Sequence, residues 1–175
     1  MATVGWWHLL ADSGNLDPCA EGWRLCPSLG SPRDREALIT ALADGVLTAV
    51  AVHHLPLDAE EILLPLDQRR AGLAGHGGRH GLVLPLLWAE LVGRRSWPVQ
   101  RLWQALSWGG SELLGREPEQ LRAGSRRWLL FDPNYGWSWD RQGCPSRAAN
   151  HPMGGKQLVG GIRASGLIPA AQWTI

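Results

Sequence analysis

The sequence has little net charge, few cysteines and no long apolar run. A formal net charge of +1 over 175 residues argues against a nucleic-acid-binding surface and against a polybasic membrane anchor. The three cysteines are odd in number and form no C-x-x-C pair, which argues against a zinc knuckle or a disulfide framework. No apolar run approaches the roughly 18 residues that span a bilayer, and the N-terminus lacks the basic region of a signal peptide. We therefore expect a cytoplasmic protein that binds neither nucleic acid nor membrane.

Phenylalanine and tyrosine occur once each, whereas tryptophan occurs 11 times. Clustered tryptophans can stack against bases or sugars, but these are scattered along the chain. Their distribution therefore favours packing in the core and on the surface. With 45% hydrophobic residues, the chain is long enough to form a domain with a core of its own.

Strand and helix patterns alternate over the first part of the chain. Residues 3–8 are predicted to form a short strand, and residues 11–32, which are rich in Gly, Pro and Ser, a loop. Ser31 and Pro32 suit the cap and the first position of a helix that ends near Ala43. The apolar, β-branched residues 48–52 then predict a strand that is buried on both faces in a parallel sheet.

The pattern changes in the second part of the chain. Residues 55–81 form a long connection that ends in a cluster of glycines and histidines, and loops of this length are usually functional or mobile. Two strongly apolar helices are predicted at residues 80–92 and 98–108, with a further helical turn at 111–114. Short strands joined by Asp-Pro-Asn, Gly and Pro turns are predicted at residues 127–131, 137–139 and 158–163.

These elements predict an α/β fold that is part of a larger architecture. A (β/α)8 barrel needs eight parallel strands and about 250 residues, and only two such strands are visible. Residues 1–120 are therefore expected to form the last part of a (β/α) barrel, and residues 121–175 a small β-rich tail. Such a barrel segment would have an unpaired strand edge, and its two apolar helices would lack part of the sheet that they cover. Self-association or a partner would relieve both problems.

Several segments, taken in order and spacing, resemble the C-terminal part of the dihydroorotases, which belong to the amidohydrolase superfamily. The first is LTAVAVHHLPLD at residues 47–58, where the family typically has Asp-His-Ala-Pro-His after its last barrel strand. The others are GWWHLL (5–10), LCPSL (25–29), SPRDREALITAL (31–42), LLFDP (129–133) and SRAANHPMGG (146–155). The resemblance covers nearly the whole chain and implies an amidohydrolase-type barrel.

The resemblance implies a chemistry that this chain does not carry. Dihydroorotases open or close a cyclic amide with water held on one or two zinc ions, and an Asp after the last strand shuttles the proton. His53 stands in place of that Asp, Cys26 in place of a substrate-contacting Asn, and Leu57 in place of a second His. The metal ligands of the earlier barrel strands have no counterpart. We therefore predict no catalytic residue, and Cys26 and Leu57 are only degenerate substrate positions.

Other sites in the sequence are weak. His8 and His53, with His76 or His80, are the candidates for a metal site, which needs three or more ligands that converge. The Gly-rich residues 72–81 lack the Lys-Ser/Thr of a phosphate-binding loop and are interpreted as a remnant of a lid over the substrate. Cys26 has no evident His or Asp partner that would make it a nucleophile.

Two classes of function follow from these observations. The first is a catalytically inactive, dihydroorotase-like protein that acts by binding, for which the resemblance implies aspartate transcarbamoylase of pyrimidine biosynthesis as the partner. The second is the C-terminal portion of a zinc-dependent dihydroorotase whose remaining barrel is encoded separately or upstream. A decayed gene product without a role is a third possibility.

Overall fold

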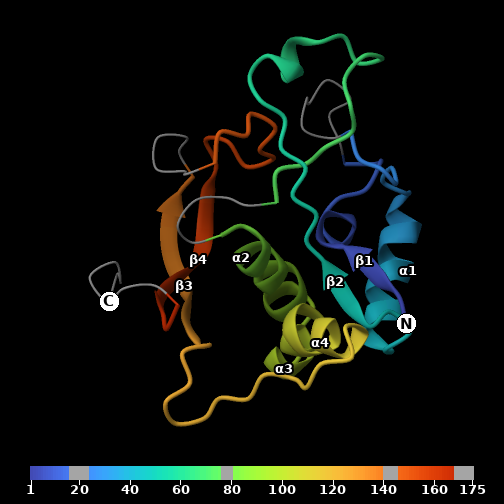
Figure 1. Cartoon of the computed structure of the whole chain (residues 1–175). Helices are drawn as coiled ribbons and strands as arrows, with labels where there is room; N and C mark the ends of the chain where they lie inside the picture. Colours follow the sequence, from blue (N-terminus) through green and yellow to red (C-terminus); the bar gives the residue numbers. More distant parts are fainter. Residues whose placement is uncertain (16–23, 76–80, 140–145, 168–175) are drawn as a thin grey trace.

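The computed structural model describes residues 1–15, 24–75, 81–139 and 146–167. Strands β1 (Thr3–Gly5) and β2 (Ala49–Ala51) form a short parallel pair with Val4 opposite Val50. Figure 1 shows this pair and α1 on one side of the molecule, the helices α2–α4 in the middle, and the strands β3 and β4 on the other side. None of the helices in the described ranges is long and apolar enough to cross a membrane.

Helix α1 (Pro32–Ala43) begins and ends where the sequence predicts. The Ser31 hydroxyl accepts a hydrogen bond from the backbone N–H of Asp34 at 3.3 Å, and the Asp34 carboxylate accepts one from the N–H of Ser31 at 2.8 Å. This reciprocal arrangement satisfies two of the backbone donors that a helix start leaves unpaired. On the inner face, Ile39 and Leu42 are buried in the core.

The parallel strands are shorter than predicted. β1 ends at Gly5, and a 3₁₀ turn (Trp6–Leu9) follows in place of the second half of the predicted strand. In β2, Val50 is buried but the flanking Val52 is exposed, so the predicted burial holds only for the middle of the segment. The reason is that β2 pairs with only one strand among the described residues, and that strand is three residues long.

The two apolar helices form close to where the sequence predicts them, and their inner leucines are buried. Helix α2 (Val83–Leu87) continues in π-helical turns (Trp88–Arg94). A second helical stretch runs through α3 (Val99–Trp103), π-helical turns (Gln104–Trp108) and α4 (Gly109–Leu113). Their inner side chains are fully buried, namely Leu82, Leu87, Leu91 and Leu102. The expectation that these helices lack part of their cover is therefore wrong for these four leucines, because β4 packs against α2 and the second stretch packs against β2, whereas Val99 is 42% exposed.

In the described part of the tail, β3 (Leu129–Ser138) and β4 (Gln157–Ser165) form an antiparallel pair. The predicted Asp-Pro-Asn turn is wrong, because residues 132–134 lie within β3. Asp132 pairs with Gly161 and Gly136 with Val159, so three residues of β3 bulge out opposite Gly160. A bulge tolerates Pro133, which has no N–H for the ladder, and the indole N–H of Trp137 closes it by donating to the Gly160 carbonyl at 2.7 Å.

A network of ion pairs joins α1 to the helical stretch that starts at α2. The buried Glu90 carboxylate accepts hydrogen bonds from Arg94 at 2.8 Å and Arg95 at 2.9 Å. Arg95 also donates to Glu36 of α1 at 2.5 and 2.7 Å, and this contact holds the pKa of the Glu36 carboxyl below its ordinary 4.5. Because Glu90 is matched by two guanidinium groups, its burial does not leave an isolated charge in the core.

Asn150 ties the tail to the connection after β2. Its side-chain Oδ1 accepts a hydrogen bond from the backbone N–H of Leu57 at 2.9 Å, and its Nδ2 donates to the carbonyl of Leu55 at 3.1 Å. Asn150 is 3% exposed and Leu57 1%, so water does not replace the bond between them. The backbone N–H of Ala149 also donates to the carbonyl of Leu57 at 2.7 Å, so several polar contacts join the tail to this connection.

We expect Asn150→Ala to lower the free energy of unfolding by about 1–3 kcal/mol, because the buried N–H of Leu57 and the partly buried carbonyl of Leu55 both lose their partner. Denaturant titration of the purified variant measures the change. Asn134→Ala is the matched control, since Asn134 is exposed on β3 and its removal should change stability by less than about 0.5 kcal/mol. Equal effects of the two substitutions would contradict the role given to Asn150.

Candidate functional site

A cavity of about 650 Å³ opens where β1 and β2 end. Its walls are mostly apolar or aromatic and include Val4, Trp6, Trp7, Leu25, Leu38, Leu55 and Leu73. Its polar residues are Thr3, His8, Cys26, Ser28, Asp34 and His53. In (β/α) folds the chemistry is carried by residues at the carboxyl ends of the strands, so this cavity is the candidate functional site.

The cavity brings together three of the residues singled out from the sequence. His53 lies two residues after the end of β2 and is exposed, and Cys26 is exposed as a free thiol. His8 reaches the cavity from the 3₁₀ turn after β1. Leu57 does not line it: its side chain is buried in the core beside Asn150. The degenerate substrate position at Leu57 is therefore a packing position in this fold.

His8 is held by a hydrogen bond in the cavity wall. Its Nε2 lies 3.0 Å from the carbonyl oxygen of Pro27, and because a carbonyl only accepts, Nε2 carries the proton. The lone pair is then on Nδ1, which is buried and has no hydrogen-bond partner. A side chain at Gly5 would reach within 2.8 Å of that nitrogen. The nitrogen that would bind a metal is therefore packed against the backbone and turned away from solvent.

The described residues do not suit a zinc ion. No group of three or more His, Cys, Asp or Glu side chains in the described ranges could hold a metal, whereas a catalytic zinc takes three protein ligands. His76 and His80, the other two candidates from the sequence, lie outside the described residues. The same holds for residues 76–80 of the Gly-rich lid segment, whereas residues 72–75 are described and buried and residue 81 is half-buried.

Asp34 is the carboxylate in the cavity wall that sequence reasoning missed. It accepts hydrogen bonds from the hydroxyl of Ser31 at 2.7 Å and from its backbone N–H, and these bonds hold the pKa of the Asp34 carboxyl below its ordinary 3.8. Asp34 is therefore ionised near neutral pH and occupied as a helix cap. It supplies negative charge to the cavity but is poorly placed to act as a general acid. The sequence predicts Ser31 as the helix cap, but no local signal shows that Asp34 lies beside the cavity.

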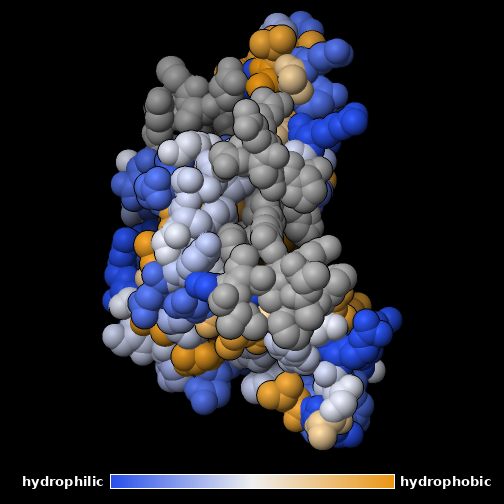
Figure 2. All heavy atoms as spheres, turned by 90° about the vertical axis from the view of Figure 1, so that its left-hand side faces the viewer, coloured by the Kyte–Doolittle hydropathy of each residue, from blue (hydrophilic) through white to orange (hydrophobic). Residues whose placement is uncertain are grey.

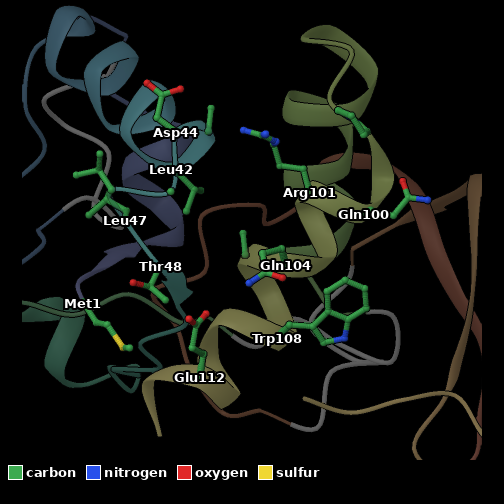
Figure 3. A pocket seen from close by; sticks show the side chains of 15 residues that line it. Met1, Leu42, Asp44, Leu47, Thr48, Gln100, Arg101, Gln104, Trp108 and Glu112 are labelled. Carbon is green, nitrogen blue, oxygen red and sulfur yellow. The ribbon is translucent and has the colours of Figure 1, made fainter. Parts of the chain in front are cut away.

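A second hollow of about 800 Å³ lies near the amino end of β2. Figure 3 shows Arg101, Gln104 and Trp108 of the second helical stretch on one side of it, with Asp44 and Leu47 on the other. Residues at this end of a (β/α) fold usually contribute to stability and not to chemistry. We therefore keep the cavity at the carboxyl ends as the candidate site.

No protein-family model matches the chain, but individual proteins of similar sequence show its family. A probable dihydroorotase-like protein from Synechocystis is 33% identical over 93% of this chain, and a dihydroorotase from Thermus aquaticus is 33% identical over 79% of it. This chain is a relative of the dihydroorotases. It spans 37% and 32% of the lengths of these two proteins.

Solved structures show the fold of this dihydroorotase relative. A D-hydantoinase from Thermus sp. superposes with a TM-score of 0.70 at 18% identity, over 93% of this chain and 37% of its own. An inactive dihydroorotase-like domain of a multifunctional protein from Chaetomium thermophilum gives a TM-score of 0.58 at 19% identity, over 92% of this chain and 40% of its own. At these identities the likeness establishes a shared mixed α/β, amidohydrolase-type fold.

Proposed function

We propose that this chain is a dihydroorotase-like protein without catalytic activity of its own, which acts as a binding or structural partner of aspartate transcarbamoylase in pyrimidine biosynthesis. In this proposal residues 1–120 are the last part of an amidohydrolase-type barrel, and residues 121–175 are its β-rich tail. The observation that carries the proposal is the cavity itself. It has the expected place at the strand ends, yet His53 stands where the family has its proton-shuttling Asp.

The remaining contents of the cavity support a role in binding. Of its two histidines, His8 is held by Pro27, and its carboxylate, Asp34, caps α1. A binding protein needs only shape and surface, and neither depends on the lost ligands. A solved relative in fold is itself described as an inactive dihydroorotase-like domain, which makes such a loss of activity compatible with this fold.

We expect the purified chain to form a stable complex with aspartate transcarbamoylase from the same source. Size-exclusion chromatography with light scattering gives the mass of each species separately and of the mixture. The chain alone is the control, because self-association would raise its own mass without the transcarbamoylase. A mixture that elutes as two unchanged species over a tenfold concentration range would refute the partner.

The alternative is that this chain forms the C-terminal portion of a zinc-dependent dihydroorotase. Two observations favour it: its curated relatives include dihydroorotases, and it spans only about a third of their length. The DNA upstream of Met1 distinguishes the two functions, since an in-frame extension with a His-x-His pair would supply metal ligands. In that case co-expression of both segments should yield dihydroorotate hydrolysis that zinc chelation abolishes.

A further inference from the structure

The loop of residues 58–70 after β2 exposes three leucines. Leu63 is 82% exposed, Leu64 41% and Leu66 61%. The loop rises at the top of Figure 1 around a 3₁₀ turn (Glu61–Leu63), and the top of the molecule in Figure 2 shows hydrophobic atoms beside strongly hydrophilic ones. Single exposed leucines are common on protein surfaces, but three within four residues form a patch that needs an explanation.

The loop holds its shape through its own hydrogen bonds. Arg69 is 6% exposed, and its Nη2 donates to the carbonyl oxygens of Ile62 and, at 2.9 Å, Leu64. At the start of the loop the Asp58 carboxylate accepts from the N–H groups of Glu60 and Glu61 at 2.9 and 2.8 Å. Burying a guanidinium carries a free-energy penalty, and here it fixes the backbone on both sides of Leu63. These hydrogen bonds therefore hold the backbone that carries the exposed leucines in a defined conformation.

Acidic side chains surround the leucines. Residues 58–70 contain four acidic residues (Asp58, Glu60, Glu61 and Asp67) and two arginines (Arg69 and Arg70). Arg69 is buried, and Arg70 pairs with Glu61 at 2.6 Å, so the exposed surface of the loop is negatively charged. A complementary surface has an apolar pocket with Lys and Arg around it.

We propose that residues 58–70, hereafter the leucine loop, dock into an apolar pocket with a basic rim on a partner protein. The charge argues against the other occupants. A second copy of the loop would oppose acid to acid, and an anionic membrane would repel it. The inference rests on the proposed function in that it gives the binding protein its contact surface, but it does not require that the partner be aspartate transcarbamoylase.

The first experiment measures the affinity for purified aspartate transcarbamoylase by calorimetry. The variant Leu63→Ser/Leu64→Ser/Leu66→Ser should bind at least tenfold more weakly, and Glu60→Lys/Asp67→Lys should also bind more weakly. Leu114→Ser/Leu121→Ser is the matched control, because these leucines are 70% and 81% exposed outside the loop, and it should bind like the unaltered chain. Circular dichroism confirms that each variant folds. Equal affinity of the triple variant would overturn the inference and leave the proposed partner intact.

If the unaltered chain does not bind aspartate transcarbamoylase, only the proposed partner is refuted. A second experiment then tests the docking of the leucine loop. A benzophenone amino acid is placed at position 66 or, as control, at 121, and the protein is irradiated in extract of the source cells. The inference is supported if a protein is cross-linked at position 66 and not at 121, through a partner peptide that is apolar and has Lys or Arg beside it. The same adduct should be lost when Leu63→Ser/Leu64→Ser is added to the cross-linking variant. No such adduct, an adduct with a second copy or one with lipid would overturn the inference.

Discussion

Dihydroorotate supplied to the purified chain in the presence of added zinc is expected to remain unhydrolysed. Loss of a positioned general acid or base alone lowers a rate by about 10²–10⁴-fold, and here His53 stands in the position of the Asp. A zinc ion would lower the pKa of a bound water toward 7 and so supply the nucleophile. A catalytic zinc takes three protein ligands, and the described residues offer no such group. The two losses together predict a rate at least about 10⁴-fold below that of an active dihydroorotase.

The measurement follows ring opening of dihydroorotate by absorbance, with a dihydroorotase of established activity as the positive control. The variant His53→Asp restores one carboxylate but no metal ligands, so it should be equally inactive. His53→Ala tests the opposite case. If the unaltered chain turned over dihydroorotate and His53→Ala abolished that activity, His53 would be a catalytic residue and the proposed loss of function would be wrong.

The parts of the fold that depend on neighbouring residues could be predicted from the sequence. Helix α1 was predicted at both ends, because Ser31 and Pro32 act within one turn of the chain. The β3 bulge was not, because the Asp-Pro-Asn sequence favours a turn and only pairing with β4 overrides it. The same reason explains the two apolar helices. Their coverage by β4 and β2 depends on contacts between distant segments, which local patterns do not contain.

The candidate site was predictable only in part. The place of His53 follows from the end of a strand, which the apolar run indicates. The walls of the cavity come from β1, from its 3₁₀ turn and from α1, and no local signal shows that Trp6 and Leu38 face one space. The leucine loop was predicted only as a long connection. Its conformation depends on the hydrogen bonds from Arg69 to two carbonyl oxygens, and no sequence pattern predicts these contacts.

A methyl group at Gly109 is expected to destabilise the whole fold. Gly109 begins α4 and is buried where the second helical stretch meets β2. A Cβ there would lie 2.0 Å from the backbone carbonyl oxygen of Thr48, far inside van der Waals contact, and neither backbone can move without disturbing the core. Overpacking of this kind typically lowers stability by about 1–3 kcal/mol and sometimes more, and we expect Gly109→Ala to lie at or above the upper end.

Gly110→Ala is the matched control for this substitution, because the next residue of the same helix has nothing within 4 Å of its added Cβ. Alanine in a helix is favoured over glycine by about 1 kcal/mol, so this variant should be as stable as the unaltered chain or more so. For a chain of this size, about 3 kcal/mol corresponds to a fall in Tm of roughly 6–12 °C. Thermal unfolding followed by circular dichroism measures both variants. If Gly109→Ala melted at the temperature of Gly110→Ala, the close packing of the second helical stretch on β2 would be wrong, and β2 would have to pack against a different segment.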